Sequence, residues 1–333
     1  MRGRGRLTRE RCWSTFLLGV AVLLSGATSS PAEAQRGTAT EGALFLLLPT
    51  GARAVGMGLA TTTIRGSSES VWWNPAGLSG RPQREAAIHH SQSLNGTGDA
   101  LNVVIPWREF GVVGIAASVL DLGEQEPRVD STGALGTLLP RQVVFAASFA
   151  TQLGRGTAGV TYKVVQFRVD CTGACVSLQA STSALDVGAQ YELGPALPIT
   201  LGVVVRNLGI QLQVNDAEQS DELPTRVEAG VEYRPRLPKR YSDQIEVRIA
   251  LDLSDDLTPS RPRARIGSEV GIQRRAFLRA GYIARSQATE GGGPTVGLGF
   301  ALRRFVVDIG RITAGLSADA GQAPTHLSVR FLF

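Results

Sequence analysis

The His-His-Ser run at residues 89–91 is the part of this sequence that comes nearest to nucleophilic chemistry. A serine hydrolase needs a serine, a histidine and a carboxylate within hydrogen-bond reach of one another. In an extended strand His89 and Ser91 share one face and His90 points to the other, while Asp99 opens the next predicted strand. No residue in the sequence fixes the orientation that a triad requires. We therefore favour ordinary polar side chains on a strand and rank a hydrolase last among the functional hypotheses.

Two other motifs resemble ligand loops but lack the residues that would complete them. The segment GARAVGMG at 51–58 has the glycines of a phosphate loop, yet no Lys-Ser or Lys-Thr pair ends it. Asp252, Ser254 and Asp256 have the alternate spacing of some calcium loops, but the glycine and glutamate of an EF-hand do not follow. The sequence therefore predicts no cofactor and no metal site, and it favours a closely packed turn at 51–58.

Cys171 and Cys175 lie in the segment CTGAC. Their spacing is not the Cys-x-x-Cys of a redox motif, and the neighbouring sequence offers no further ligands for a metal. We favour a small disulfide that closes a loop, which fits an oxidising compartment.

Acidic and basic residues alternate on one face of several predicted strands. In the clearest of these, 244–253, Glu246, Arg248 and Asp252 oppose apolar residues at the alternate positions. Both signs occur along this face, so we expect interior ion pairs that stiffen the protein, whereas a charge-selective pore would show one dominant sign. The predicted inward-facing charges are Arg226, Glu228, Glu232, Glu246, Arg248, Asp252, Arg265, Glu269, Arg279 and Asp308.

These candidate residues lie on segments with the two-residue periodicity of β-strands. Short turns alternate with longer loops between most of the segments, which is typical of an outer-membrane β-barrel. A soluble sandwich shows the same periodicity without that pattern of connections. Aromatic residues make up only 6% of the chain, which predicts thin aromatic girdles. The predicted strands are 84–94, 99–106, 111–122, 141–152, 156–168, 180–193, 198–208, 225–234, 244–253, 263–273, 276–284, 294–303, 304–312 and 324–333.

The last segment, THLSVRFLF at 325–333, is typical of the closing strand of such a barrel. Phe331 and Phe333 occupy alternate apolar positions at its end. An unpaired strand edge is not tolerated in lipid, so we expect this strand to pair with the first one. The sequence thus predicts an all-β fold, a transmembrane antiparallel barrel of about fourteen strands over residues 84–333.

The first 34 residues have the three parts of an export signal: a basic start, an apolar run and an Ala-Glu-Ala cleavage site. Cleavage removes five arginines and two glutamates and brings the net charge from +5 to +2. The high isoelectric point is therefore mostly a property of the signal, and no basic stripe interleaved with aromatic residues indicates nucleic acid. The remaining sequence has no apolar run long enough for a spanning helix.

Residues 35–83 contain no strand of lipid-spanning length, and we expect them to form a plug inside or beneath the barrel. Asn74 and Pro75 predict a short helix, with asparagine as its cap and proline at the first helical position. The plug residues that the motifs single out are Gly51, Arg53, Gly56, Gly58, Trp73, Asn74, Pro75 and Gly77.

The motifs GARAVGMG and WWNPAGL together resemble the N-terminal signature of the PorV/PorQ family of outer-membrane proteins, relatives of the FadL-type channels. Similar segments continue to the closing THLSVRFLF, so the resemblance covers nearly the whole mature chain. It implies a fourteen-stranded barrel with an N-terminal plug. Two departures are the stretch RGSSE at 65–69, where the family commonly carries an acidic pair, and Trp72, where tyrosine or another aromatic residue is usual.

The resemblance also implies a non-enzymatic protein of the outer membrane that takes part in type IX-like protein secretion, holding exported cargo and passing it on. Its partners would be outer-membrane lipid, the barrel-assembly machinery, and secretion proteins with their cargo. The alternative, suggested by the FadL relatives, is a passive channel for hydrophobic small molecules. That function requires an apolar pocket near the outer rim and a plug that moves.

Overall fold

The structure, a computed structural model of the chain, describes residues 42–80, 83–93, 96–107, 110–126, 136–173, 175–213, 220–255, 262–284, 292–314 and 323–333. The predicted signal at 1–34, the start of the predicted plug and Asp256 lie outside these ranges. Within the described ranges, no helix is both long and apolar enough to cross a membrane.

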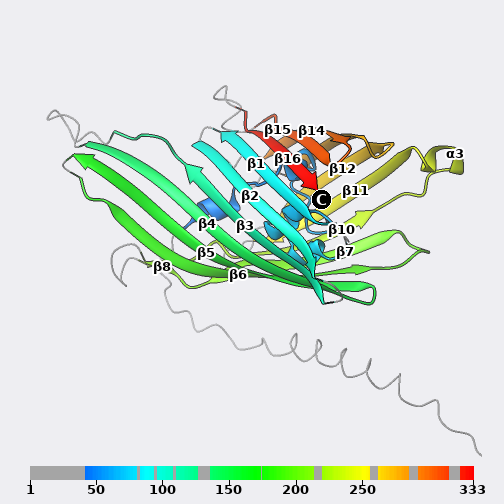
Figure 1. The fold of residues 1–333 in the computed structure, drawn as a ribbon, viewed down its shortest axis with the longest axis horizontal. Helices are drawn as coiled ribbons and strands as arrows, with labels where there is room; N and C mark the ends of the chain where they lie inside the picture. Colours follow the sequence, from blue (N-terminus) through cyan, green and yellow to red (C-terminus); the bar gives the residue numbers. More distant parts are fainter. Residues whose placement is uncertain are drawn as a thin grey trace, which may run out of the picture. The chain divides into compact units, whose positions relative to one another are not determined.

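Antiparallel strands close into a barrel of fourteen, as the sequence predicts (Figure 1). A separate two-stranded sheet of β8 (Leu212–Gln213) and β9 (Ser220–Asp221) lies in the connection from β7 to β10. The barrel strands are β1 (Glu85–Ser93), β2 (Gly96–Trp107), β3 (Gly111–Asp121), β4 (Gly136–Leu153), β5 (Gly156–Gly173), β6 (Leu178–Glu192), β7 (Ile199–Gly209), β10 (Arg226–Tyr233), β11 (Ile245–Asp255), β12 (Arg263–Ile272), β13 (Ala276–Ile283), β14 (Gly293–Leu302), β15 (Phe305–Ile312) and β16 (Thr325–Leu332).

Alternation of side chains along each strand separates an apolar outer face from a polar inner face. On β1, Ile88 is 61% exposed on the outside, whereas the next residue, His89, is 3% exposed on the inside. On β15, the outward Val307 and Ile309 flank the buried, inward Asp308. An apolar outer face around a polar interior is the pattern of a barrel in lipid.

The first and last strands pair directly, which confirms the predicted closure. Their antiparallel register starts with Glu85 opposite Leu332. Beyond it, the backbone N–H of Phe333 donates to the carbonyl of Arg84 at 3.1 Å. The rings of Phe331 and Phe333 stack with their centroids 5.6 Å apart. Closure pairs both edges of every barrel strand, which is the condition for placing a sheet in hydrocarbon.

Two strands are longer than the sequence pattern predicts. β4 and β5 have 18 residues each, and their added residues pair with one another as far as Gly136 opposite Gly173. The hairpin therefore extends past the adjacent strands (Figure 1). Cys171 and Cys175 form a disulfide at this end. The extension shows no alternation because both of its faces are partly exposed, and alternation requires one buried face.

Several aromatic side chains gather at the end of the barrel that has most of the short connections, which we call the turn end; the opposite end is the loop end. Trp107 and Phe110 flank the β2–β3 turn with ring centroids 6.1 Å apart. Phe305 contacts Phe331 across β15 and β16 at 4.9 Å. Although the aromatic content is low, concentration at one rim gives that rim an aromatic girdle of the kind that marks a membrane interface.

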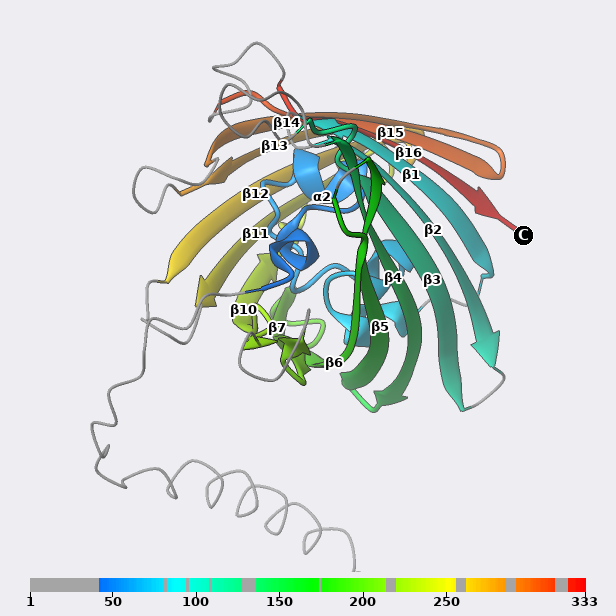
Figure 2. The ribbon, with the colours of Figure 1, turned by 90° about the vertical axis from the view of Figure 1, so that its left-hand side faces the viewer.

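Residues 42–80, which we call the inner segment, run inside the barrel (Figure 2). Asn74 caps the predicted short helix, its side chain accepting from the N–H of Ala76 at 3.1 Å. The prediction of a turn over the whole of 51–58 was wrong in part. Residues 52–56 form a helix, which the chain enters through Gly51 at a φ of 96°. The elements of the inner segment are η1 (Leu44–Leu47), α2 (Ala52–Gly56), η2 (Ser68–Val71) and η3 (Pro75–Leu78).

Candidate functional site: the inner segment and the cavity beside it

Carboxylates of the barrel wall accept hydrogen bonds from the inner segment. Asp252 on β11 accepts from the backbone N–H of Thr61 at 2.6 Å, and from the N–H and hydroxyl of Thr62 at 2.8 Å each. Glu85 on β1 accepts from the N–H of Ser68 at 3.0 Å and from its hydroxyl at 2.5 Å. Hydrogen bonds to charged acceptors are roughly twice as strong as neutral ones. These contacts therefore fix the path of the segment through the barrel.

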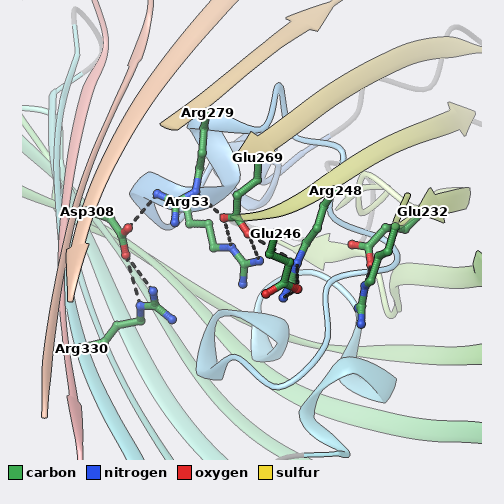
Figure 3. Close-up of polar contacts among 9 residues, drawn as sticks. Arg53, Glu232, Glu246, Arg248, Glu269, Arg279, Asp308 and Arg330 are labelled. Atoms are coloured by element: carbon green, nitrogen blue, oxygen red, sulfur yellow. Dashed lines mark hydrogen bonds and ion pairs between the residues drawn. The ribbon is translucent and has the colours of Figure 1, made fainter. Parts of the chain in front are cut away.

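A chain of ion pairs joins helix α2 to strands β12, β13, β15 and β16 (Figure 3). Arg53 donates from two nitrogens to the two oxygens of Glu269, at 3.0 Å each. Glu269 also accepts from Arg279 at 2.6 Å, and Arg279 continues to Asp308 at 2.7 Å. Arg330 reaches the other oxygen of Asp308 at 2.9 Å. All five side chains are buried, so removal of either carboxylate would leave buried cations without their partner.

A β-bulge turns two neighbouring residues of β7 into the interior. The register with β6 shifts next to Asp186, and both Arg206 and Asn207 are buried. Asn207 accepts from Lys163 Nζ at 2.9 Å and donates its backbone N–H to Asp186 at 2.8 Å. Lys163 and Asp186 form an ion pair of 2.6 Å. A bulge re-aims side chains in this way, and here it builds a compensated charge cluster into the wall.

Glycines line the inner wall where the backbone of the inner segment runs against it. A Cβ added to Gly159 would lie 2.4 Å from the carbonyl carbon of Pro75, and one added to Gly267 would lie 2.2 Å from the carbonyl oxygen of Met57. Separations below 3.0 Å essentially never occur for real Cβ atoms, so no side chain fits at these positions. We call this set the glycine track: Gly159, Gly202, Gly267, Gly281, Gly297 and Gly310, together with Gly188, where the Cβ would meet the side chain of Asn74.

Glu69, in η2, is a buried carboxyl group with no hydrogen-bond partner among the described residues. The side chain is 0% exposed, and neither of its oxygens is bonded. Burial raises the pKa of Glu69 to about 7, and nearby Asp308 adds to this rise while Arg330, Arg53 and Arg279 oppose it. The carboxyl group is therefore poised to change its charge near neutral pH.

We expect the inner segment to pack less stably as the pH rises from about 4.5 to about 7. In this window folded Glu69 retains a proton that the unfolded chain has released, so rising pH favours the unfolded state. The stabilisation from protonated Glu69 is complete below a pH of about 4.5 and lost above a pH of about 7. Glu69→Gln should reduce this dependence, measured as the urea midpoint of Trp72 and Trp73 fluorescence at pH 5 and pH 8 in a Trp107→Phe background. An unchanged pH dependence in Glu69→Gln would contradict the assignment.

The residues of the predicted hydrolase do not come together. Ser91 donates its hydroxyl to the carbonyl of Gly98 at 3.1 Å rather than to a histidine. Asp99 lies 2.8 Å from His90, and both of these side chains are at least half exposed. His89 is buried on the other face of the strand from His90. No assembly of Ser91, His89 and Asp99 forms.

His89 contacts a different serine, Ser328 on β16. Its Nδ1 lies 2.8 Å from the Ser328 hydroxyl, and its Nε2 lies 2.7 Å from the side-chain oxygen of Asn102. The same hydroxyl accepts from the backbone N–H of Ala52 at 2.8 Å. Ser328 is thus occupied in joining the wall to the start of α2, and the oxygen of Asn102 requires the hydrogen of neutral His89 to be on Nε2. The arrangement holds the inner segment in place.

A cavity of about 80 Å³ lies between the inner segment and the strands β1 to β5, β7 and β16, toward the loop end. Apolar residues of the inner segment form one side, and mixed residues of the wall form the other. Arg206 lies 4.9 Å from the ring centroid of Trp73 at the cavity edge. The apolar lining consists of Phe45, Leu46, Leu48, Pro49, Trp72, Trp73, Ala100, Val119, Leu120 and Val144, and the polar lining includes His89, Ser91, Asp99, Ser118, Gln142, Lys163, Arg206 and His326.

The predicted plug residues occupy distinct places. Trp73 and Gly51 line the cavity, and Arg53 forms the ion pair to Glu269. A Cβ on Gly56 would meet Gly297, and one on Gly58, at 2.5 Å from the carbonyl oxygen of Ile266, would meet the wall. In η3, Asn74 and Pro75 pack on the glycine track, while a Cβ on Gly77 would lie 2.1 Å from the carbonyl oxygen of Ile64.

Most of the predicted lumen charges form ion pairs, whereas Asp252 accepts hydrogen bonds from Thr61 and Thr62, and they are not equally buried. Glu246 is 44% exposed near the turn end, where it pairs with Arg248 at 2.6 Å. Glu228 is buried and lies between Arg206 and Arg265, at 3.2 and 3.3 Å. Arg226, Glu232 and Asp252 are buried, and Glu232 pairs with Arg234. Glu269, Arg279 and Asp308 belong to the chain of ion pairs that joins α2 to the wall.

Sequence reasoning missed Glu69, Ser328, Lys163 and the glycine track. Glycines at inward positions were a usable signal, because an inward glycine in a strand indicates close approach of another backbone. Within the described part of the chain, no group of three or more potential metal ligands occurs.

No protein-family model matches the sequence, and no curated protein is significantly similar to it. Solved structures share the fold. A FadL homologue from Pseudomonas aeruginosa aligns over 86% of this chain and 98% of its own, with a TM-score of 0.56 and 9% identity. The monoaromatic hydrocarbon channel CymD aligns over 86% of this chain and 97% of its own, with a TM-score of 0.56 and 13% identity. The toluene transporter TodX of P. putida aligns over 85% of this chain and 96% of its own, with a TM-score of 0.55 and 11% identity. At these identities the likeness shows that the fold is that of a FadL-type barrel.

Proposed function

We propose that this chain is an outer-membrane channel that admits small hydrophobic molecules and is closed at rest by its inner segment. The observation that carries the proposal is the cavity beside Trp72 and Trp73, whose inner-segment side is apolar and whose wall side is mixed. The apolar outer surface supports a place in lipid, and the fold is shared with a monoaromatic hydrocarbon channel and a toluene transporter. No enzymatic role is proposed, because Ser91 and Asp99 do not assemble with His89.

The cavity is too small for an aromatic ring in its resting form. A cavity of about 150 Å³ holds benzene, and the cavity here has about 80 Å³. A ligand must therefore displace side chains of the inner segment. Phe45 and Leu46 of η1 are the candidates, because apolar side chains form no directional bonds to the wall, whereas α2 is fixed by Arg53. We propose that η1 yields to the ligand while α2 stays in place.

The interior charges suit a path for neutral molecules. Charge-selective pores carry rings of one sign, whereas here Glu228 lies between two arginines and Lys163 lies against Asp186. These pairs leave little uncompensated charge to attract ions, and they stiffen the wall around the inner segment. We therefore expect low ion conductance in the resting protein.

Val144→Trp is expected to lower uptake of a toluene-sized aromatic by roughly tenfold, the equivalent of about 1.4 kcal/mol of lost binding. Val144 lines the cavity on β4, and an indole at this position fills the space. The matched control is Val143→Trp, whose side chain points outward on the same strand. Uptake by cells that express each variant at equal surface level is the measurement. Equal uptake by both variants would rule out the cavity as the ligand site.

A PorV-like role in secretion remains the second hypothesis. It rests on the N-terminal motifs GARAVGMG and WWNPAGL. Cross-linking in intact outer membranes, followed by mass spectrometry of the captured proteins, tests it. Recovery of exported cargo at the inner segment would support this hypothesis, and recovery of lipid without protein would remove it.

A further inference from the structure

The turn end of the barrel carries exposed basic side chains, which we call the basic rim. Two of the tight turns are built from arginine pairs, 274–275 between β12 and β13 and 303–304 between β14 and β15. None of these four arginines, nor Arg84 before β1, forms an ion pair with a described residue. The basic rim consists of Arg84, Arg155, Arg236, Lys239, Arg240, Arg274, Arg275, Arg303 and Arg304, all exposed.

The loop end has the opposite charge in its connecting sequences. The connection from β7 to β10, IQLQVNDAEQSDELP at 210–224, contains four acidic residues and no lysine or arginine. The connection at 122–135 contains three acidic residues and one arginine. At the turn end, acidic Glu192 is already paired with Arg65. The connecting sequences at the two ends of the barrel therefore differ in the sign of their charge.

We propose that the basic rim binds the phosphate groups of anionic phospholipid headgroups in the leaflet at the turn end. The inference rests on the membrane placement proposed above. Trp107 and Phe305 belong to the aromatic girdle, which marks the headgroup level, and the rim lies just beyond it. Eight of its nine members are arginine, whose planar fork binds phosphate through two parallel hydrogen bonds. A basic surface at this depth gains free energy from an anionic leaflet.

One sector of the rim has its own spectroscopic reporter. Strands β15, β16, β1 and β2 are successive neighbours, and the carbonyls of Arg304 and Arg84 accept from Leu332 and Phe333 at the chain end, at 2.8 and 3.1 Å. With strands about 4.8 Å apart, a lipid bound at Arg84 lies within contact range of Trp107. Trp107 is 57% exposed on the outer surface. The other tryptophans of the described chain, Trp72 and Trp73, are buried inside the barrel.

The test is quenching of Trp107 by brominated lipids. The mature full-length protein is placed in phosphatidylcholine vesicles that contain increasing amounts of brominated phosphatidylglycerol. The reference series uses phosphatidylglycerol vesicles that contain increasing amounts of brominated phosphatidylcholine. The emission of Trp107→Phe is subtracted. We expect phosphatidylglycerol to be preferred over phosphatidylcholine by about threefold or more in low salt. Arg84→Gln/Arg303→Gln/Arg304→Gln should reduce this ratio to about one, since glutamine removes the positive charge.

The matched control removes three arginines at the loop end, Arg141→Gln/Arg168→Gln/Arg311→Gln, and should keep the preference. Heat-modifiable migration in gels confirms that both variants fold. Equal quenching by the two lipids in the wild type overturns the proposal, as does a preference that survives in the rim variant or is lost equally in the control. If the basic rim instead binds an acidic protein, the two lipids should quench Trp107 equally. The assay requires no transport, so its failure and a failure of the channel proposal are distinguishable.

Discussion

Replacing Glu269 by glutamine is expected to lower the free energy of unfolding by about 3–5 kcal/mol and to loosen the inner segment. The carboxylate pairs with Arg53 and Arg279, and it lies 3.7 Å from Arg248. Glutamine preserves the shape but removes the negative charge, so buried guanidinium groups lose their counterion. Because Arg53 belongs to α2, part of the effect should be release of that helix. Urea titration in detergent measures the first effect, and ion conductance in planar bilayers measures the second.

Glu246→Gln is the control for this experiment. Glu246 pairs with Arg248 at 2.6 Å, but it is 44% exposed. Exposed ion pairs contribute about 0–1 kcal/mol, so this variant should unfold and conduct nearly as the wild type does. If Glu269→Gln also behaved as the wild type, the ion-pair chain would not be what fixes α2 in the barrel.

Gly159→Ala should push η3 away from the wall and make the barrel leak small polar solutes. The new Cβ would lie 2.4 Å from the carbonyl carbon of Pro75 and 2.5 Å from the nitrogen of Ala76. Both are backbone atoms, so no side-chain rotation relieves the clash, and overpacking of this kind costs about 1–3 kcal/mol. A shift of about 1.4 kcal/mol in the equilibrium between seated and displaced segment raises the displaced population roughly tenfold. Sucrose influx into proteoliposomes should rise accordingly.

Gly156→Ala provides the comparison on the same strand. Its new Cβ would meet its nearest neighbour at 3.4 Å, which is an ordinary contact. Sucrose influx should therefore remain at the wild-type level. Equal leakage by Gly159→Ala and Gly156→Ala would mean that the glycine track does not seat the inner segment.

The barrel could be predicted from the sequence because burial of one face leaves a two-residue period in nearly every strand. The strand over Ile245–Asp255 shows this directly, with apolar residues outside and Asp252 inside. The ends of β4 and β5 could not be predicted, since both faces of the extension are partly exposed and carry no period. The short helix capped by Asn74 was predictable because the capping residue and the proline that follows it are local signals.

The candidate site was predicted only in part, because its contacts join residues far apart in the chain. Arg53 was singled out as a plug residue and Glu269 as a lumen charge, but nothing in the sequence joins positions 216 residues apart. His89 was weighed with Ser91, its neighbour, whereas its partner is Ser328 across the barrel seam. Local spacing predicts which face a side chain takes. The closure of the barrel determines which residues that side chain contacts.

The most direct test of the channel proposal is the uptake of a radiolabelled toluene-sized aromatic and of sucrose by intact cells that express or lack this protein. The proposal predicts that expression speeds entry of the aromatic and leaves sucrose entry unchanged, and that Val144→Trp lowers this gain roughly tenfold. Entry of sucrose as fast as the aromatic, or no effect of expression on either compound, would contradict it.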